Sequence, residues 1–216
     1  MNNILQLKNL SYKYAKNLPE VLNDINYSFE SGKMYAIVGK SGAGKTTLLS
    51  LLSGLAKPTG GEILFDGKSI KKIDKYKYRS KYVGVIFQNF NLLSYLNAKE
   101  NVILSMDISR KKIKNKSQTA EKLLNKVGLT GDDIKRNILK LSGGQQQRVA
   151  IARALSYDPH VILADEPTGN LDGETQNEII SILRTLANEG KCVIVVTHSP
   201  DVSAAADVVY NLQNNT

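Results

Sequence analysis

The N-terminal part of the chain alternates apolar and polar residues. This alternation over residues 4–7 and 25–29 predicts strands with one face in solvent. Residues 62–65 form a third strand of this kind, which runs into a tight turn at Asp66 and Gly67. Together the three segments predict a small antiparallel sheet.

Three other segments are almost wholly apolar: Met34–Val38, residues 161–164 and Cys192–Val196. Short apolar runs are typical of parallel strands that are buried on both faces. Helical spacing predicts helices between them, over residues 46–55, 119–127 (ending at Gly128), 149–155 and 178–186. We therefore expect one α/β domain over residues 1–216, with an antiparallel β subdomain at the N-terminus and a mostly helical insertion over about residues 89–158.

The charge of the chain is concentrated in two places. The net charge is +9, yet residues 68–81 hold seven basic side chains and one acid, and residues 110–116 hold five basic side chains and no acid. A solvated lysine-rich face is the first interpretation, and contact with anionic lipid headgroups is the second. Nucleic acid is the weakest, because no aromatic-rich basic platform accompanies the charge. We expect no nucleic-acid partner.

Composition limits the remaining possibilities. No apolar run approaches the ~18 residues of a membrane span, and the first ten residues lack the apolar core of a signal peptide. The sequence therefore predicts a cytoplasmic protein. The single cysteine, Cys192, excludes an internal disulfide and a multi-cysteine zinc site, and its apolar surroundings predict a buried thiol. Two histidines, His160 and His198, are too few for a histidine-rich metal site.

Residues 39–46 match the phosphate-binding loop pattern G-x-x-x-x-G-K-[ST]. A buried strand precedes the loop and a helix follows it, so backbone N–H groups and the helix N-terminus favour phosphate there. We expect Lys45 to reach the β- and γ-phosphates of ATP and the Thr46 hydroxyl to bind Mg²⁺. The predicted nucleotide-binding residues of this segment are Gly39, Lys40, Ser41, Gly42, Ala43, Gly44, Lys45, Thr46 and Thr47.

Two carboxylates, Asp165 and Glu166, follow the buried strand over residues 161–164. Ligands of an open parallel sheet bind at the carboxyl ends of its strands. Asp165 is therefore predicted to hold the Mg²⁺ shell, and Glu166 to orient and deprotonate the attacking water. The alternative is that the pair caps a helix.

The segment over residues 141–148, Leu-Ser-Gly-Gly-Gln-Gln-Gln-Arg, resembles the signature sequence of ABC transporter ATPases. Small residues at the start of a helix leave its N–H groups open to a γ-phosphate. The resemblance implies that this phosphate belongs to a nucleotide on the opposite subunit, contacted by Ser142, Gly143, Gly144 and Gln145. It also argues against the other classes of phosphate-loop protein, kinases included.

Further residues resemble family elements in the expected order. Gln88 matches the glutamine that contacts Mg²⁺ and the lytic water, and His198 matches the switch histidine at the γ-phosphate. Residues 169–172, which end in Asp172, match the loop that joins two active sites across a dimer. Tyr14 corresponds to the aromatic residue that stacks on adenine, with Tyr12 as a rival. Residues 89–101 are expected to form the groove that receives a membrane partner.

The resemblance covers nearly the whole chain and is strongest to the branch with macrolide exporters, lipoprotein-release ATPases and the cell-division pair (MacB, LolD and FtsE types). Residues 90–93, 100–102 and 164–172 support this placement, whereas Lys40 and Gly173 depart from it without removing a catalytic group. The branch implies a transport-coupled ATPase at the cytoplasmic face of the membrane, a homodimer bound to integral-membrane permease subunits. Export of antimicrobial peptides or drugs, lipoprotein handling, and force transmission in cell-wall or division signalling stay open. A soluble ABC ATPase of DNA repair or translation is a remoter alternative.

Overall fold

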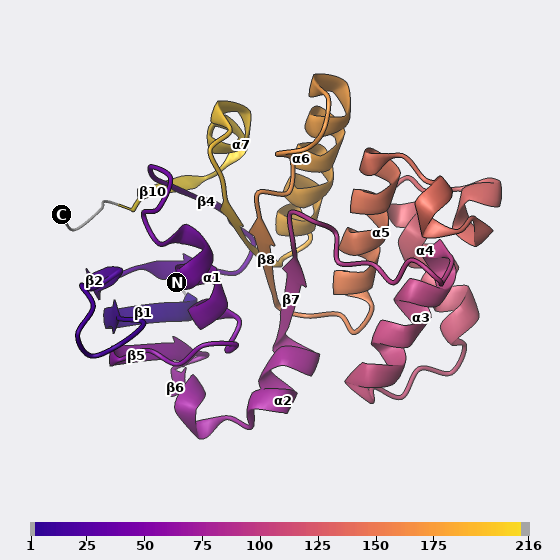
Figure 1. Ribbon diagram of the computed structural model, residues 1–216. Coiled ribbons are helices and arrows are strands. Elements are labelled where there is room, and N and C mark those ends of the chain that lie inside the picture. Colours follow the sequence, from indigo (N-terminus) through magenta and orange to yellow (C-terminus); the bar gives the residue numbers. More distant parts are fainter. Residues whose placement is uncertain (1–2, 213–216) are drawn as a thin grey trace.

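Two β-sheets and a group of helices make up the computed structural model, which describes residues 3–212 (Figure 1). The central sheet has the strand order β10–β4–β9–β8–β7, and all its strands are parallel. Its bounds are β4 (Met34–Val38), β7 (Val83–Ile86), β8 (Val161–Asp165), β9 (Cys192–Val196) and β10 (Val208–Asn211). The three predicted buried strands, β4, β8 and β9, are confirmed as neighbours at its centre.

The central sheet separates two apolar cores. Along β9, Cys192, Ile194 and Val196 enter one core, and Val193 and Val195 enter the other. The first core also holds the apolar face of α1 (Lys45–Leu52). The second core holds those of α6 (Gly173–Asn188) and α7 (Pro200–Ala205). Burial raises the pKa of the Cys192 thiol, as its predicted buried position requires.

The antiparallel sheet consists of β1 (Asn3–Tyr12), β2 (Leu22–Ile25), β3 (Ser28–Glu30), β5 (Gly60–Phe65) and β6 (Lys68–Ser69). The prediction of one continuous strand over residues 25–29 was wrong, because β2 and β3 pair with different parts of β1. Asn26 explains the break. Its Oδ1 accepts a hydrogen bond from the Asn9 N–H (2.8 Å), and its Nδ2 donates to the Asp24 carbonyl (2.8 Å), so a side chain replaces the strand ladder.

Between β7 and β8 the chain forms α3 (Ala98–Ser109), α4 (Lys116–Lys126) and α5 (Gly143–Leu155), at the right of Figure 1. Helical turns at Gly131–Lys135 and Ile138–Lys140 join α4 to α5. The predicted helix over residues 119–127 begins earlier because the Asn115 side chain accepts from the Gln118 N–H (3.0 Å). This arrangement fits the inserted helices of the predicted fold, and the limits of the insertion at residues 89 and 158 stay a prediction.

The remaining elements are short. α2 (Lys75–Lys77) and the turns Ile70–Lys72 and Tyr78–Tyr82 lead from β6 to β7. The helix predicted over residues 46–55 ends at Leu52, since Gly54 has a φ of 71° that leaves the helix. Within residues 3–212, no helix combines the length and the apolar character that crossing a bilayer requires.

Candidate active site

A cleft of about 690 Å³ opens at the carboxyl ends of the central strands. It collects predicted residues from far apart in the sequence: Tyr14, Ser41, Gly42, Gly44, Lys45, Thr46, Thr47, Gln88, Asp165, Glu166 and His198. Val21 and Gly169 complete the lining. The topology of the sheet brings the phosphate-loop pattern and the carboxylate pair to one place, as the sequence predicts.

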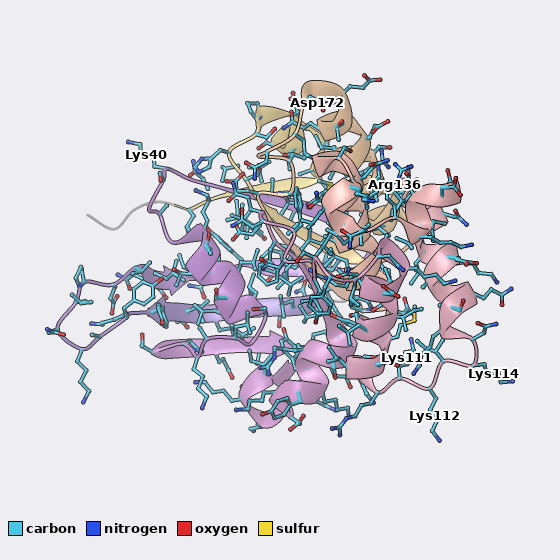
Figure 2. All side chains as sticks on the ribbon, turned by 45° about the vertical axis from the view of Figure 1, so that its right-hand side comes forward. Lys40, Lys111, Lys112, Lys114, Arg136 and Asp172 are labelled. Atoms are coloured by element: carbon cyan, nitrogen blue, oxygen red, sulfur yellow. The ribbon has the colours of Figure 1, made fainter. Side chains whose placement is uncertain are left out.

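The loop before α1 has a shape that only glycine allows at its last position. Gly44 is the N-cap of α1 with φ 90°, and a Cβ there would lie 2.8 Å from Val21 Cγ1. No side chain caps this helix. The N–H groups of its first turn are therefore available to an anion in the cleft. Ala43 is buried behind the loop, and the exposed Lys40 side chain points away from the body of the molecule (Figure 2).

Lys45 is 7% exposed and lies folded against its own loop. Its Nζ donates to the carbonyls of Gly39 (2.9 Å) and Lys40 (3.2 Å), and it lies 2.9 Å from Nε2 of His198. An ammonium group can only donate, so His198 Nε2 is the acceptor in this contact. His198 Nε2 also lies 3.5 Å from Glu166 Oε1.

The two carboxylates at the end of β8 differ in their surroundings. Asp165 Oδ1 accepts from the Thr46 hydroxyl (3.4 Å). Burial raises the pKa of Asp165, against the opposing effects of the Thr46 hydrogen bond and the Lys45 charge. Neither residue caps a helix, because the next helix, α6, begins at Gly173 and has Asp172 as its N-cap. The alternative of a capping pair was therefore wrong.

Glu166 occupies a strained backbone position, with φ 44° in the left-handed region. Its N–H donates to the Val196 carbonyl (2.9 Å), and its Oε2 accepts from the His198 N–H (3.2 Å). Its other oxygen, Oε1, is buried and has no hydrogen-bond partner among the described residues. A buried carboxylate oxygen without a donor is suited to accept a proton from a small ligand in the cleft.

The donors in this cleft fit Mg²⁺. Thr46 offers a hydroxyl, Asp165 a carboxylate and Gln88 a side-chain amide, all hard oxygen ligands. No cluster of three or more His, Cys, Asp or Glu residues suited to a metal exists within residues 3–212. A set of few protein oxygens is what Mg²⁺ takes when it shares its shell with phosphates and water.

The predicted signature residues lie apart from this cleft, at the start of α5. Ser142 is the N-cap, and it forms a reciprocal capping box with Gln145 (Ser142 N–H to Gln145 Oε1, 2.9 Å; Gln145 N–H to Ser142 Oγ, 3.2 Å). A Cβ on Gly144 would lie 2.3 Å from Thr175 Cγ2, so α5 and α6 approach closely only because residue 144 is glycine.

Asp172 lies beside this helix start and caps α6 (Figure 2). Its two carboxylate oxygens accept from the backbone N–H and the hydroxyl of Thr175, at 2.9 Å each. These bonds lower the pKa of Asp172. Gly143 is near Leu171 of the same loop. The structure thus gathers the predicted dimer-facing residues in a second location, away from the glycine loop.

The two rival tyrosines have different surroundings. The Tyr14 ring is 65% exposed, lines the cleft, and its hydroxyl lies 2.7 Å from the Thr47 hydroxyl. Tyr12 is partly buried against the core and meets Tyr14 edge-on, with ring centroids 5.2 Å apart. This geometry favours Tyr14 as the ring available to a planar ligand.

Two residues of this region were missed. Val21 lines the cleft, but a valine near a strand looks like any core residue in sequence. Arg153 donates from Nη2 to the Phe90 carbonyl (2.8 Å) and from Nη1 to the Asn91 carbonyl, so it holds the segment after Gln88. Phe90 and Asn91 both have positive φ, and such backbone contacts leave no sequence signal.

Comparisons with known proteins agree with this geometry. The family model described as "ABC transporter" matches residues 22–169. The ABC transporter ATP-binding protein YclH of Bacillus subtilis is 45% identical over 214 residues, which cover 99% of this chain and 95% of YclH.

A second relative and a solved structure extend the comparison. The macrolide export ATP-binding/permease protein MacB of Campylobacter jejuni is 42% identical over 212 residues, which cover 96% of this chain but only 32% of MacB. The dimeric post-hydrolysis structure of the ATP-binding cassette MJ0796, bound to ADP and Pi, superposes with a TM-score of 0.87 at 36% identity, over 98% of this chain and 97% of that one.

Proposed function

This chain belongs to the ABC transporter family as an ATP-binding subunit with ATPase activity, and we propose that it works as one half of a head-to-tail homodimer that drives an integral-membrane permease. The supporting observation is that two surfaces suited to phosphate, the loop before α1 and the start of α5, lie apart on one chain. A head-to-tail partner would place its Ser142 segment over the nucleotide held here. The similar cassette MJ0796 is dimeric in its post-hydrolysis structure with ADP and Pi.

Lys45 and the first turn of α1 bind the phosphates in this proposal. The Lys45 ammonium exchanges its contacts with the Gly39 carbonyl and His198 for the β- and γ-phosphate oxygens of ATP. His198 is then free to contact the γ-phosphate. Tyr14 stacks on the adenine ring, and the N–H groups after Gly44 bind phosphate oxygens.

Glu166 acts as the base of hydrolysis. Thr46, Asp165 and Gln88 would hold Mg²⁺, which neutralises charge on the phosphates when bound. The oxygen of a water attacks the γ-phosphorus, the bond from phosphorus to the bridging oxygen of ADP breaks, and Glu166 Oε1 takes the water proton. That proton passes to the phosphate product. The strained φ of Glu166 points to a side-chain direction that the function requires.

Glu166→Gln tests this assignment. The amide keeps the shape of the side chain but cannot take the proton, so we expect ATP binding to persist, the dimer to be trapped, and turnover to fall about 100- to 10,000-fold. ATPase assays and gel filtration with ATP measure these effects. Glu189→Gln, at the far end of α6, removes the same charge and should leave turnover unchanged. Turnover near wild type in Glu166→Gln would contradict the proposal.

The permease is proposed to dock in a groove of about 330 Å³ beside the segment over residues 89–101. Phe87 and Asn91 line it, together with Leu55, which is 59% exposed. Gln88, in the nucleotide cleft, lies between Phe87 and this segment, so a change at the nucleotide reaches the groove directly. Leu55→Asp should prevent recovery of a membrane partner from the native membrane and leave ATP affinity intact. Unchanged recovery would contradict this docking site.

The identity to the macrolide exporter MacB supports export of a drug as the task of the complex. Export of an antimicrobial peptide and lipoprotein handling are further proposals from the resemblance in sequence. This chain spans about a third of the length of MacB, so the permease part has no counterpart in the matched region. Force transmission in cell-wall or division signalling is the alternative. Mass spectrometry of the proteins that co-purify with the tagged chain tests these assignments. A partner with few spans and a large extracytoplasmic domain supports this branch, and recovery of soluble DNA- or ribosome-bound proteins alone would contradict it.

A further inference from the structure

The two basic segments noted in the sequence meet in space around a second cleft. This cleft, of about 960 Å³, lies between the chain that leads into β7 and the end of α3. Lys77, Arg79 and Lys81 come from the first segment, and Arg110 comes from the second. Figure 1 shows α2 and the lower part of α3 next to each other at the bottom of the molecule, and we name this surface the basic cleft.

The basic cleft is separate from the nucleotide cleft. Lys81 precedes β7, and Tyr157, which also lines the basic cleft, precedes β8. Both residues therefore stand at the amino-terminal edge of the parallel sheet, whereas ATP is proposed to bind at its carboxyl edge. A phosphate group bound in the basic cleft would therefore lie outside the ATPase site.

The positive charge of this cleft is largely uncompensated. Over residues 3–212, no ion pair or side-chain hydrogen bond holds the Lys77, Lys81 or Arg110 side chains. Asp74 is the one acid in the lining, and its carboxylate accepts from the Lys77 backbone N–H (2.8 Å) as the cap of α2. Lys112 and Lys114, also exposed, extend the charge beyond Arg110 (Figure 2). Like charges held this close attract a multivalent anionic surface.

Exposed apolar side chains stand among these cations. Tyr76 is 67% exposed and Ile108 is 69% exposed, and both line the basic cleft. Lys75 and Arg79 lie 5.6 and 5.4 Å from the Tyr76 ring centroid, so the cations surround the aromatic ring. Amphipathic aromatic rings beside basic side chains are typical of surfaces that rest at the headgroup level of a bilayer. A merely solvated lysine face would need neither Tyr76 nor Ile108.

We propose that the basic cleft binds the phosphate headgroups of anionic phospholipids in a bilayer, with Tyr76 and Ile108 at the boundary of the acyl chains. The cleft shares Arg79, Ser105 and Tyr157 with the groove proposed for the permease, so a subunit docked there would hold this surface near the membrane. The lipid contact itself requires no permease and no ATP hydrolysis.

Flotation of the purified chain with vesicles tests the proposal. Vesicles of phosphatidylcholine mixed with phosphatidylglycerol should carry the protein upward, and phosphatidylcholine alone should not. Lys81→Glu with Arg110→Glu, one change from each segment, should weaken binding about tenfold or more, since each cation near an anionic bilayer raises partitioning roughly fivefold. Tyr76→Ser should weaken it a few-fold at every salt concentration.

A matched control is Lys8→Glu with Lys135→Glu, two exposed lysines outside both segments with the same total change of charge. This control should float like wild type, and both double variants should retain ATPase activity as evidence of folding. Equal loss in the two double variants would overturn the proposal, because net charge alone would then explain binding. Release by inorganic phosphate but not by chloride at matched ionic strength would also overturn it, in favour of a soluble phosphate site. Binding of an oligonucleotide is measured in parallel. If Lys81→Glu with Arg110→Glu lost oligonucleotide binding but floated like wild type, the result would contradict the lipid proposal in favour of nucleic acid.

Discussion

The starts of α1 and α5 are both suited to phosphate, but they differ in how their N–H groups are satisfied. α1 begins at Gly44 without any side-chain cap. α5 begins at Ser142, whose reciprocal bonds with Gln145 form a capping box. An uncapped end needs a ligand to complete it, whereas a capped end is stable alone and gains a ligand as an addition. We infer that the first site binds ATP in the single chain and that the second acts only when two chains meet.

Lys45→Ala should have the largest effect of these variants, and it should act on ATP binding at the start of α1. Removal of the ammonium takes away charge-assisted hydrogen bonds to the phosphates, which corresponds to a loss of ATP affinity of about 100-fold. Titration calorimetry with ATP measures it. Lys57→Ala, an exposed lysine after α1, serves as the control and should bind ATP normally. Equal affinity in the two variants would remove Lys45 from the phosphate site.

Gly144→Ala should disturb the start of α5 without affecting α1. The new Cβ would overlap Thr175 Cγ2, and a misfit of this kind costs about 1–3 kcal/mol, or roughly 2–12 °C in Tm for a chain of this size. Gly143→Ala meets only an ordinary contact, 3.6 Å from Leu171, and should keep the Tm. Adding Thr175→Ser removes the overlapping methyl group and keeps the hydroxyl, so it should restore Gly144→Ala. Failure of this rescue would contradict the packing explanation.

Ser142 variants separate capping from phosphate contact. Ser142→Ala loses the cap and should lower the free energy of unfolding by about 1 kcal/mol. Ser142→Asp keeps a capping oxygen but brings a negative charge to the surface offered to the partner's γ-phosphate. It should retain the Tm and lose hydrolysis, while ATP affinity of the single chain stays the same. Thermal melts and ATPase assays measure both, and full activity of Ser142→Asp would place the partner's phosphate elsewhere.

The carboxylates Asp165 and Asp172 should give small effects of opposite sign. Burial raises the pKa of Asp165 above its unfolded value, so its ionised form destabilises the ligand-free fold at neutral pH. Asp165→Asn should then raise the Tm at pH 7 without nucleotide or Mg²⁺, and the gain should fade as the pH falls through the raised folded pKa and be gone below the unfolded pKa of about 4.

The reverse holds at Asp172, because the Thr175 bonds lower its pKa. Its stabilisation is present above the unfolded pKa and is lost as the pH falls through the folded value. Asp172→Asn should therefore lower the Tm at pH 7 and make little difference in acid. Melting curves across this pH range check both signs, and the same sign for the two variants would contradict the assigned environments.

The sequence predicts the parts of the molecule where chemistry and periodicity are local. β4, β8 and β9 follow from unbroken apolar runs, and the cleft follows because parallel strands end at one edge. α3 was not predicted, since it buries the polar Asn101 and Ser109 and exposes Ile108, which blurs the helical period. β10 was not predicted either, because it is a short edge strand that is only partly buried beside β4.

The relative position of distant segments could not be predicted from the sequence either. That residues 74–81 and 105–110 enclose one cleft depends on how α3 packs beside the turn Tyr78–Tyr82, and no motif encodes that packing. The same holds for the close approach of Gly144 to Thr175. The roles of Lys45, Thr46, Asp165 and Glu166 followed from the phosphate-loop pattern and the strand end, whereas those of Gln88, His198, Tyr14 and Asp172 were carried by the resemblance. All of them stay predictions for experiment to test.

The burial of Cys192 makes the chain a ready starting point for site-specific labelling. Its thiol is the single one in the sequence, is fully enclosed in β9, and has a raised pKa, so it reacts slowly with maleimides at neutral pH. A cysteine introduced at exposed Lys112 or Glu174 would then be the one reactive site on the folded chain. Fluorophores or spin labels at these positions can follow the approach of two subunits, or of one subunit and a bilayer, without first removing a native residue.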